Sequence, residues 1–190
     1  MNRNYIEALL KSNKQFIERT GKDFFEDHIE RQTPYMTLIT CSDSRVQNEA
    51  FQDNSFNKVF VIRNIGNQIY SNEGSVDYGI LHLKTPVLFI LGHTDCGAIK
   101  AFISGYKSEP ISIIHELDHL IPVISNEKKS LIVHISKNIH YQANIALEKY
   151  NDLVLENKLI ILGGIYDFRN EMNEGFGKIK IININGKVQE

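Results

Sequence analysis

Cysteine is scarce and tryptophan is absent, since the 190 residues include two cysteines and no tryptophan. Two cysteines do not build a disulfide framework, so we expect a reducing, cytoplasmic setting. No stretch approaches the roughly 20 apolar residues that span a bilayer, and the first residues lack the apolar core of a secretory signal. Charges of both signs nearly balance, at a net −2, which predicts binding neither to nucleic acid nor to a membrane.

Compact apolar runs alternate with segments of helical periodicity. The continuous apolar runs are typical of strands buried on both faces of a parallel sheet, and they are residues 35–40, 58–62, 86–91 and 158–162. Apolar residues recur at helical spacing in residues 3–19, 71–83, 97–104, 111–124 and 130–156. This alternation predicts an α/β fold with a mostly parallel central sheet flanked by helices.

The length and the ordinary composition favour one domain over residues 1–190. We expect it to comprise an N-terminal helical arm at 1–34, an α/β core at 35–168 and a C-terminal edge strand or tail at 169–190. Within that tail, residues 178–183 are expected to form the strand, with Asn185 and Gly186 as its turn.

Both cysteines lie close to the ends of predicted strands. Cys41 follows one apolar run, and His93 and Cys96 follow another, three residues apart. Ligand sites in open α/β sheets gather beyond the carboxyl ends of the strands. Two thiols and one imidazole form a donor set that suits zinc. The alternative is that both cysteines are inert buried thiols and that His93 is a core histidine.

An acidic and a basic residue lie beside the first cysteine. Structural zinc has four protein ligands, whereas catalytic zinc keeps one position for water. Asp43 is the candidate fourth ligand, but its spacing from Arg45 allows the two side chains to pair. We hypothesise a switch between a closed and an open zinc shell. Zinc lowers the pKa of its water to about 7, which generates a nucleophile for a small electrophilic carbon such as that of carbon dioxide.

Several segments together resemble the β-class carbonic anhydrases. Cys41-Ser42-Asp43-Ser44-Arg45 is similar to the family's Cys-x-Asp-x-Arg motif, and His93-Thr94-Asp95-Cys96-Gly97 to its His-x-x-Cys-Gly motif. Further similarity covers residues 60–67, 75–78 and 163–167, so the resemblance extends over about residues 30–168. It implies zinc-dependent, reversible hydration of carbon dioxide to bicarbonate and a proton by zinc-bound hydroxide.

The resemblance also assigns roles to individual residues. It implies zinc binding by Cys41, His93 and Cys96, with Asp43 and Arg45 as a catalytic dyad. It implies a substrate pocket formed by Gln32, Phe60 and Tyr78. It further implies a homodimer, or a tetramer built from dimers, in which the N-terminal amphipathic helix packs on the partner and both subunits contribute to the pocket. Leu38 replaces a tryptophan found in the regulated form of the family, which favours an open site.

Two other functions are compatible with the same motifs. One is a hydrolase of carbonyl sulfide or carbon disulfide on the same scaffold. The other is a non-catalytic zinc protein in which Asp43 is a permanent fourth ligand. His115 and His119, at i and i+4, offer a second pair of metal donors, but an ordinary surface pair is the favoured interpretation because no third ligand is evident.

Overall fold

The computed structural model describes residues 2–26, 28–50, 52–124 and 129–189. Contacts divide the chain into two compact units, Met1–Thr33 and Pro34–Glu190, and each is described separately. The single-domain organisation over residues 1–190 stays a prediction.

Two helices form the N-terminal unit, α1 (Asn2–Thr20) and α2 (Lys22–Glu26). The helix expected over residues 3–19 is therefore confirmed. The rings of Phe16 and Phe25 meet edge to face, with centroids 6.2 Å apart, and join the two helices. Other apolar side chains of α1 are exposed, namely those of Tyr5, Ile6, Leu9, Leu10 and Ile17. Packing of this helix on a partner stays a prediction.

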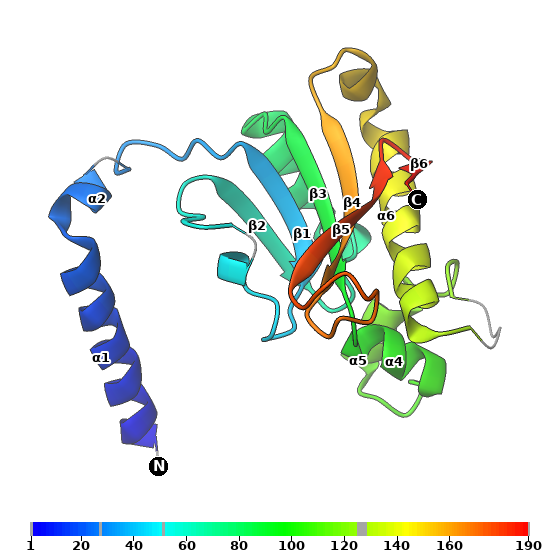
Figure 1. The fold of residues 1–190 in the computed structure, drawn as a ribbon, viewed down its shortest axis with the longest axis horizontal. Coiled ribbons are helices and arrows are strands. Elements are labelled where there is room, and N and C mark those ends of the chain that lie inside the picture. The colour runs from blue at the N-terminus through cyan, green and yellow to red at the C-terminus, as the bar shows by residue number, and fades with distance from the viewer. Residues whose placement is uncertain (1, 27, 51, 125–128, 190) are drawn as a thin grey trace. The chain divides into compact units, whose positions relative to one another are not determined.

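The second unit is built on a six-stranded sheet with the order β2-β1-β3-β4-β5-β6 (Figure 1). The strands are β1 (Met36–Cys41), β2 (Val59–Asn64), β3 (Val87–His93), β4 (Ile160–Asp167), β5 (Lys178–Ile184) and β6 (Lys187–Val188). The first four strands are parallel, whereas β5 and β6 pair in antiparallel fashion. The predicted α/β fold with a mostly parallel sheet is confirmed.

The central strands are apolar because both of their faces are covered. Every residue of β1 is buried, and so is nearly all of β3. Two threonines interrupt the apolar run of β1, and the hydroxyl group of each makes a hydrogen bond. Thr37 Oγ1 lies 2.7 Å from Thr85 Oγ1, and Thr40 Oγ1 donates to the carbonyl of Leu91 at 2.9 Å. These hydrogen bonds offset the cost of burying polar groups.

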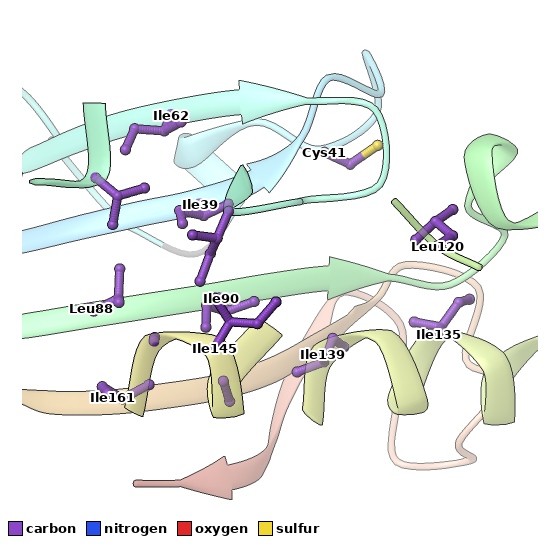
Figure 2. Packing of buried hydrophobic residues seen from close by; sticks show 14 of the residues in the cluster. Ile39, Cys41, Ile62, Leu88, Ile90, Leu120, Ile135, Ile139, Ile145 and Ile161 are labelled. Atoms are coloured by element: carbon purple, nitrogen blue, oxygen red, sulfur yellow. The ribbon is translucent and has the colours of Figure 1, made fainter. Parts of the chain in front are cut away.

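The longest helix, α6 (Leu131–Leu155), packs against β3, β4 and β5. Figure 2 shows Ile139 and Ile145 of α6 among the buried residues beside Ile90 and Ile161 of the strands. In the same view, Cys41 lies at the end of its strand, at the margin of the apolar core. Packing therefore places this thiol where buried core gives way to the strand-end loops.

The shorter helices connect the strands. They are η1 (Asn48–Ala50), η2 (Tyr70–Asn72), α3 (Glu73–Asp77), η3 (Tyr78–His82), α4 (Gly97–Ser104) and α5 (Ile111–Asp118). No helix within the described ranges has the length and apolar character needed to cross a bilayer.

Two predicted helices differ in detail from the observed ones. The segment expected as one helix over 71–83 contains successive 3-10, α and π turns, ending with η3. The helix expected over 111–124 ends at Asp118, and the rest of that segment forms isolated turns. Pro122 explains this end, because it lacks a backbone N–H and its ring clashes with a helical carbonyl four residues earlier.

Close packing of α6 on the sheet predicts a stability effect at Gly92. A Cβ at this position would lie 2.6 Å from Cδ1 of Ile139, closer than packed atoms allow. We expect Gly92→Ala to lower the free energy of unfolding by about 1–3 kcal/mol, measured by urea denaturation. Gly74→Ala is the matched control. In the described structure, no atom other than those of its chain neighbours and its own helix backbone lies within 4 Å of the added methyl. Equal unfolding midpoints for the two variants would contradict this packing.

Candidate metal centre

The three predicted zinc ligands meet at the carboxyl edge of the sheet. Cys41 ends β1 and His93 ends β3, and these neighbouring strands are parallel, so their ends share one edge. Cys96 lies three residues beyond His93 and immediately precedes α4. One ligand atom from each of the three residues lies within 4.8 Å of the other two, and all three residues are buried. The fold therefore collects two sulfurs and one nitrogen around a common point.

The hydrogen bonds of His93 leave one ring nitrogen available. Nδ1 lies 2.8 Å from the carbonyl oxygen of Thr94, and because a carbonyl only accepts, Nδ1 carries the proton. Nε2 is buried and has no hydrogen-bond partner among the described residues. A buried nitrogen without a partner is costly unless it binds something, and a neutral imidazole with a bonded Nδ1–H is the usual form of a metal-ligating histidine. The donor set fits zinc.

The pKa values of the two thiols shift in opposite directions. A hydrogen bond from the Cys96 side chain lowers the pKa of Cys41, assisted by His93 and by the backbone N–H of Gly66, while burial opposes the shift. The same hydrogen bond, together with burial, raises the pKa of Cys96. A bound zinc ion would hold both sulfurs as thiolates.

Asp43 lies next to the three ligands, but its carboxylate is held by Arg45. Arg45 Nε donates to Asp43 Oδ1 at 2.9 Å, and Nη2 donates to Oδ2 at 2.7 Å, so the pairing is bidentate. The backbone N–H of Arg45 also donates to Oδ1 at 2.9 Å. Oδ2 lies 3.9 Å from His93 Nε2. The structure thus contains the Asp43–Arg45 pair that the spacing allows, with both carboxylate oxygens engaged.

Arg45 is itself fixed by residues from two other strand ends. Its Nη1 donates to Asp95 Oδ2 at 2.9 Å, and its guanidinium carbon lies 4.6 Å from the ring centroid of Phe168. Phe168 also stacks on the His93 ring, with centroids 5.9 Å apart. Asp95 in turn pairs with Lys100 and with Arg169, whose Nη1 lies 2.7 Å from Oδ1. Arg45 therefore has little freedom to leave Asp43.

Sequence reasoning missed the roles of Phe168 and Arg169. Both follow β4 directly, and β4 is the neighbour of β3 in the sheet. Their position directly after a parallel strand predicts that they lie at the carboxyl edge of the sheet, as the metal ligands do. Only the order of the strands shows that they lie next to His93 and Arg45. Arg63, near the end of β2, donates to the carbonyl oxygens of Cys41 and Val46, at 3.0 and 2.6 Å.

A cavity of about 340 Å³ opens beside Cys41 and Asp43. Its wall is mainly apolar and includes Ile65, Ala98, Ala101, Ile113 and Leu117. Such a wall suits a small uncharged molecule better than an ion.

The predicted pocket residues Phe60 and Tyr78 lie elsewhere in the second unit. Their rings contact each other, with centroids 5.8 Å apart. Phe60 pairs with Thr37, four residues before Cys41 along the parallel strands, which is about 13 Å at the usual rise per residue. Gln32 is exposed and belongs to the N-terminal unit. Their roles in substrate binding stay predictions.

The ionisation of Asp43 predicts how stability depends on pH. Hydrogen bonds from Arg45 lower the pKa of Asp43 from 3.8 to about 2, against the effect of burial. A lowered pKa stabilises the fold above the ordinary value, and this contribution is lost as the pH falls towards 2. With a chelator present, we expect Asp43→Asn to lower the free energy of unfolding by a constant amount between about pH 8 and pH 5, and by less below about pH 4. A difference that changes between pH 8 and pH 5 would contradict this ionisation.

Several solved structures have the fold of this chain. The solved structures with similar folds include a tetrameric β-carbonic anhydrase of Sordaria macrospora, with a TM-score of 0.80 and 22% identity, covering 95% of this chain and 98% of that one. Another is a β-carbonic anhydrase of Coccomyxa solved with acetazolamide, with a TM-score of 0.77 and 23% identity, covering 93% and 86%. The fold is thus that of the β-carbonic anhydrases.

Sequence comparison gives the family directly. The family model described as carbonic anhydrase matches residues 36–172, and the chain belongs to this family. Carbonic anhydrases of Mycolicibacterium smegmatis and Synechococcus elongatus are 39% identical over 74 residues and 36% identical over 108 residues. These alignments cover 38% and 53% of this chain but only 36% and 39% of the relatives' own lengths.

Proposed function

We propose that this protein is a zinc-dependent carbonic anhydrase that reversibly hydrates carbon dioxide to bicarbonate and a proton. The observation that carries the proposal is the convergence of Cys41, His93 and Cys96 beside an aspartate whose two oxygens are both bonded to Arg45. Because Arg45 engages Asp43, the described residues offer three ligands rather than the four of a structural zinc site. Membership of the carbonic anhydrase family supports the same conclusion.

The metal ligands would be the two sulfurs and Nε2 of His93. Zinc bound there would lower the pKa of a coordinated water molecule to about 7, which makes a nucleophile available at neutral pH. The hydrogen bond from Nδ1 to the carbonyl of Thr94 would hold the His93 ring in the tautomer that binds metal.

Asp43 would orient the attacking oxygen by accepting a hydrogen bond. A carboxylate with a pKa of about 2 stays ionised throughout the neutral range, so Asp43 is an acceptor and does not serve as the acid or base that carries the product proton. That proton would leave to solvent or buffer. Arg45, fixed by Asp95 and Phe168, would keep the carboxylate at one angle.

The cavity beside Asp43 would receive carbon dioxide. Its apolar wall, with Ile65 and Leu117, offers an uncharged gas a site where it need not compete strongly with water. Gln32, Phe60 and Tyr78 would complete the substrate pocket. Because Phe60 and Tyr78 lie along the strands away from this cavity, we propose that they act on the site of another copy of the chain.

Assembly and location belong to the same proposal. We propose a homodimer or a tetramer built from dimers, which the tetrameric state of the Sordaria macrospora relative supports. We propose the cytoplasm as its location, because a site of two unpaired cysteines needs reduced thiols.

Stopped-flow measurement of carbon dioxide hydration on zinc-quantified protein tests the proposed activity. We expect the rate to rise in proportion to bound zinc and to fall to the uncatalysed rate after chelation. Carbonyl sulfide and carbon disulfide, assayed in parallel, should be hydrolysed far more slowly. If zinc-loaded protein does not hydrate carbon dioxide, the zinc site is structural and the proposed activity is wrong. If either sulfur compound is hydrolysed faster than carbon dioxide is hydrated, that compound is the substrate.

A further inference from the structure

The guanidinium group of Arg45 lies between two carboxylates and uses different nitrogens for their oxygens. Nε and Nη2 donate to the two oxygens of Asp43, at 2.9 and 2.7 Å. Nη1 donates to Oδ2 of Asp95 at 2.9 Å. Because Nη1 makes no bond to Asp43, the two carboxylates do not compete for it. The bond to Asp95 instead limits how far the guanidinium can move away from Asp43.

Asp95 is itself held by other cations and by its place in the backbone. It lies between His93 and Cys96, in the turn that carries two of the proposed ligands, and its φ of 63° is in the left-handed region. Aspartate visits that conformation more readily than most residues. Oδ1 of Asp95 pairs with Lys100 and lies 2.7 Å from Nη1 of Arg169. These contacts fix the carboxylate, so that its other oxygen remains available to the guanidinium.

The carboxylate of Asp43 lies just outside the shell of a metal bound at His93. Oδ2 of Asp43 is 3.9 Å from Nε2 of His93. Two donor atoms in one tetrahedral zinc shell lie about 3.4 Å apart, given bonds of about 2.1 Å. Asp43 is therefore only slightly too far from Nε2 to share a metal ion with it. Its bidentate pairing with Arg45 holds it at that distance.

We propose that Asp95 is a positioning residue that keeps the metal centre open, because it holds Arg45 on Asp43 and thereby keeps that carboxylate off the metal. The inference rests on the proposed function in assuming a metal ion at the three predicted ligands. It goes beyond that function in naming the residue that decides between an open and a closed shell. A closed shell has no position for water, so Asp95 sets the fraction of the protein that can react.

Azide binding to full-length protein loaded with cobalt(II) tests the proposal at one neutral pH. Azide needs the coordination position that a closed shell lacks, and the visible absorption of cobalt follows its binding. Asp95→Asn keeps the shape of the side chain and suits the left-handed backbone, but its amide has one acceptor oxygen instead of two. We expect the apparent dissociation constant for azide to rise about 3- to 10-fold, because it varies inversely with the open fraction.

The direction of this change separates the proposal from a simple effect of charge. Asp95→Asn removes a negative charge near the metal, so electrostatics alone predicts tighter binding of an anion. Glu171→Gln is the matched control, because it removes the same charge from the same cluster. Glu171 pairs with Arg169, at 3.2 Å from Nε, and not with Arg45. We expect this control to bind azide as tightly as unaltered protein or slightly more tightly.

Two further variants keep the test decisive. Asp95→Gly removes the whole side chain at a φ that glycine adopts without strain, and it should weaken azide binding at least as much as Asp95→Asn. Removal of Asp43 should abolish the effect of residue 95, because no carboxylate then remains to close the shell. We expect the double variant Asp43→Ala, Asp95→Asn to bind azide at least as tightly as Asp43→Ala alone.

The inference is wrong if both Asp95 variants bind azide as tightly as unaltered protein, or more tightly. It is also wrong if the double variant binds azide more weakly than Asp43→Ala alone, since the effect then does not act through Asp43. Unaltered protein that binds cobalt and azide, but does not hydrate carbon dioxide in its zinc form, would refute the proposed function alone. Failure to bind metal would refute both.

Discussion

Replacing Cys41 by alanine is expected to remove zinc and hydration activity together. Cys41 supplies one of the two sulfurs at the site, and its loss would leave two protein ligands, fewer than the three that hold a catalytic zinc ion. We expect bound zinc to fall from one ion per chain to near zero. Hydration should decrease by more than about 10⁴-fold, since enzymatic accelerations are commonly about 10⁶-fold or larger. Metal analysis and stopped-flow hydration assays on the same preparation measure the two effects.

Ser44→Ala is the control for that substitution. Ser44 lies in the same loop and is exposed, so its variant should keep both zinc and activity. The three-ligand site would be wrong if Cys41→Ala retained a full equivalent of zinc and its hydration rate. Loss of activity with zinc retained would place Cys41 in some role other than metal binding.

Replacing Asp43 by asparagine is expected to separate metal binding from turnover. Both oxygens of Asp43 accept hydrogen bonds from Arg45, so the carboxylate is not needed to hold the metal. Asparagine keeps the shape but replaces one acceptor oxygen by a donor amide, which cannot accept a hydrogen bond from the attacking oxygen. We expect zinc content to stay near one per chain and hydration turnover to fall by about 10²-fold, the size of effect expected when a reacting group loses its orientation.

The same variant distinguishes an enzyme from a structural zinc protein. If Asp43 were a permanent fourth ligand, its substitution would weaken zinc binding, which competition with a chelator would detect. Asp53→Asn, at an exposed carboxylate outside the site, is the control and should change neither quantity. Unchanged turnover in Asp43→Asn would remove the proposed role of Asp43.

Much of the fold could be predicted because each element has a local signal. The continuous apolar run 86–91 predicted a buried parallel strand, and the observed strand β3 covers Val87–His93, within two residues of the prediction at each end. The convergence of Cys41, His93 and Cys96 was also predictable, because they lie at or just beyond the ends of strands whose ends must meet once the strands are parallel neighbours. In both cases the information lies within a few residues of the element concerned.

The remaining parts depend on packing between distant segments. Phe168 contacts Arg45 because β4 lies beside β3, and Asn138 reaches Gly66 because α6 covers that part of the sheet. A polar residue on an apolar helix face indicates that a partner exists but not which one. The π turn Tyr78–His82 covers only five residues, too few for the spacing of apolar residues to distinguish it from an α-helix, so its hydrogen-bond pattern could not be predicted.

X-ray absorption spectroscopy of the zinc-loaded protein tests the central claim most directly, because it counts and identifies the atoms bound to the metal. We expect two sulfur atoms at about 2.3 Å, one imidazole nitrogen at about 2.0–2.1 Å and one further light atom. The same spectrum is expected for Asp43→Asn, since Asp43 is engaged by Arg45. A shell without two sulfurs, or a light atom that disappears when Asp43 is replaced, would contradict a zinc ion held by Cys41, His93 and Cys96 alone.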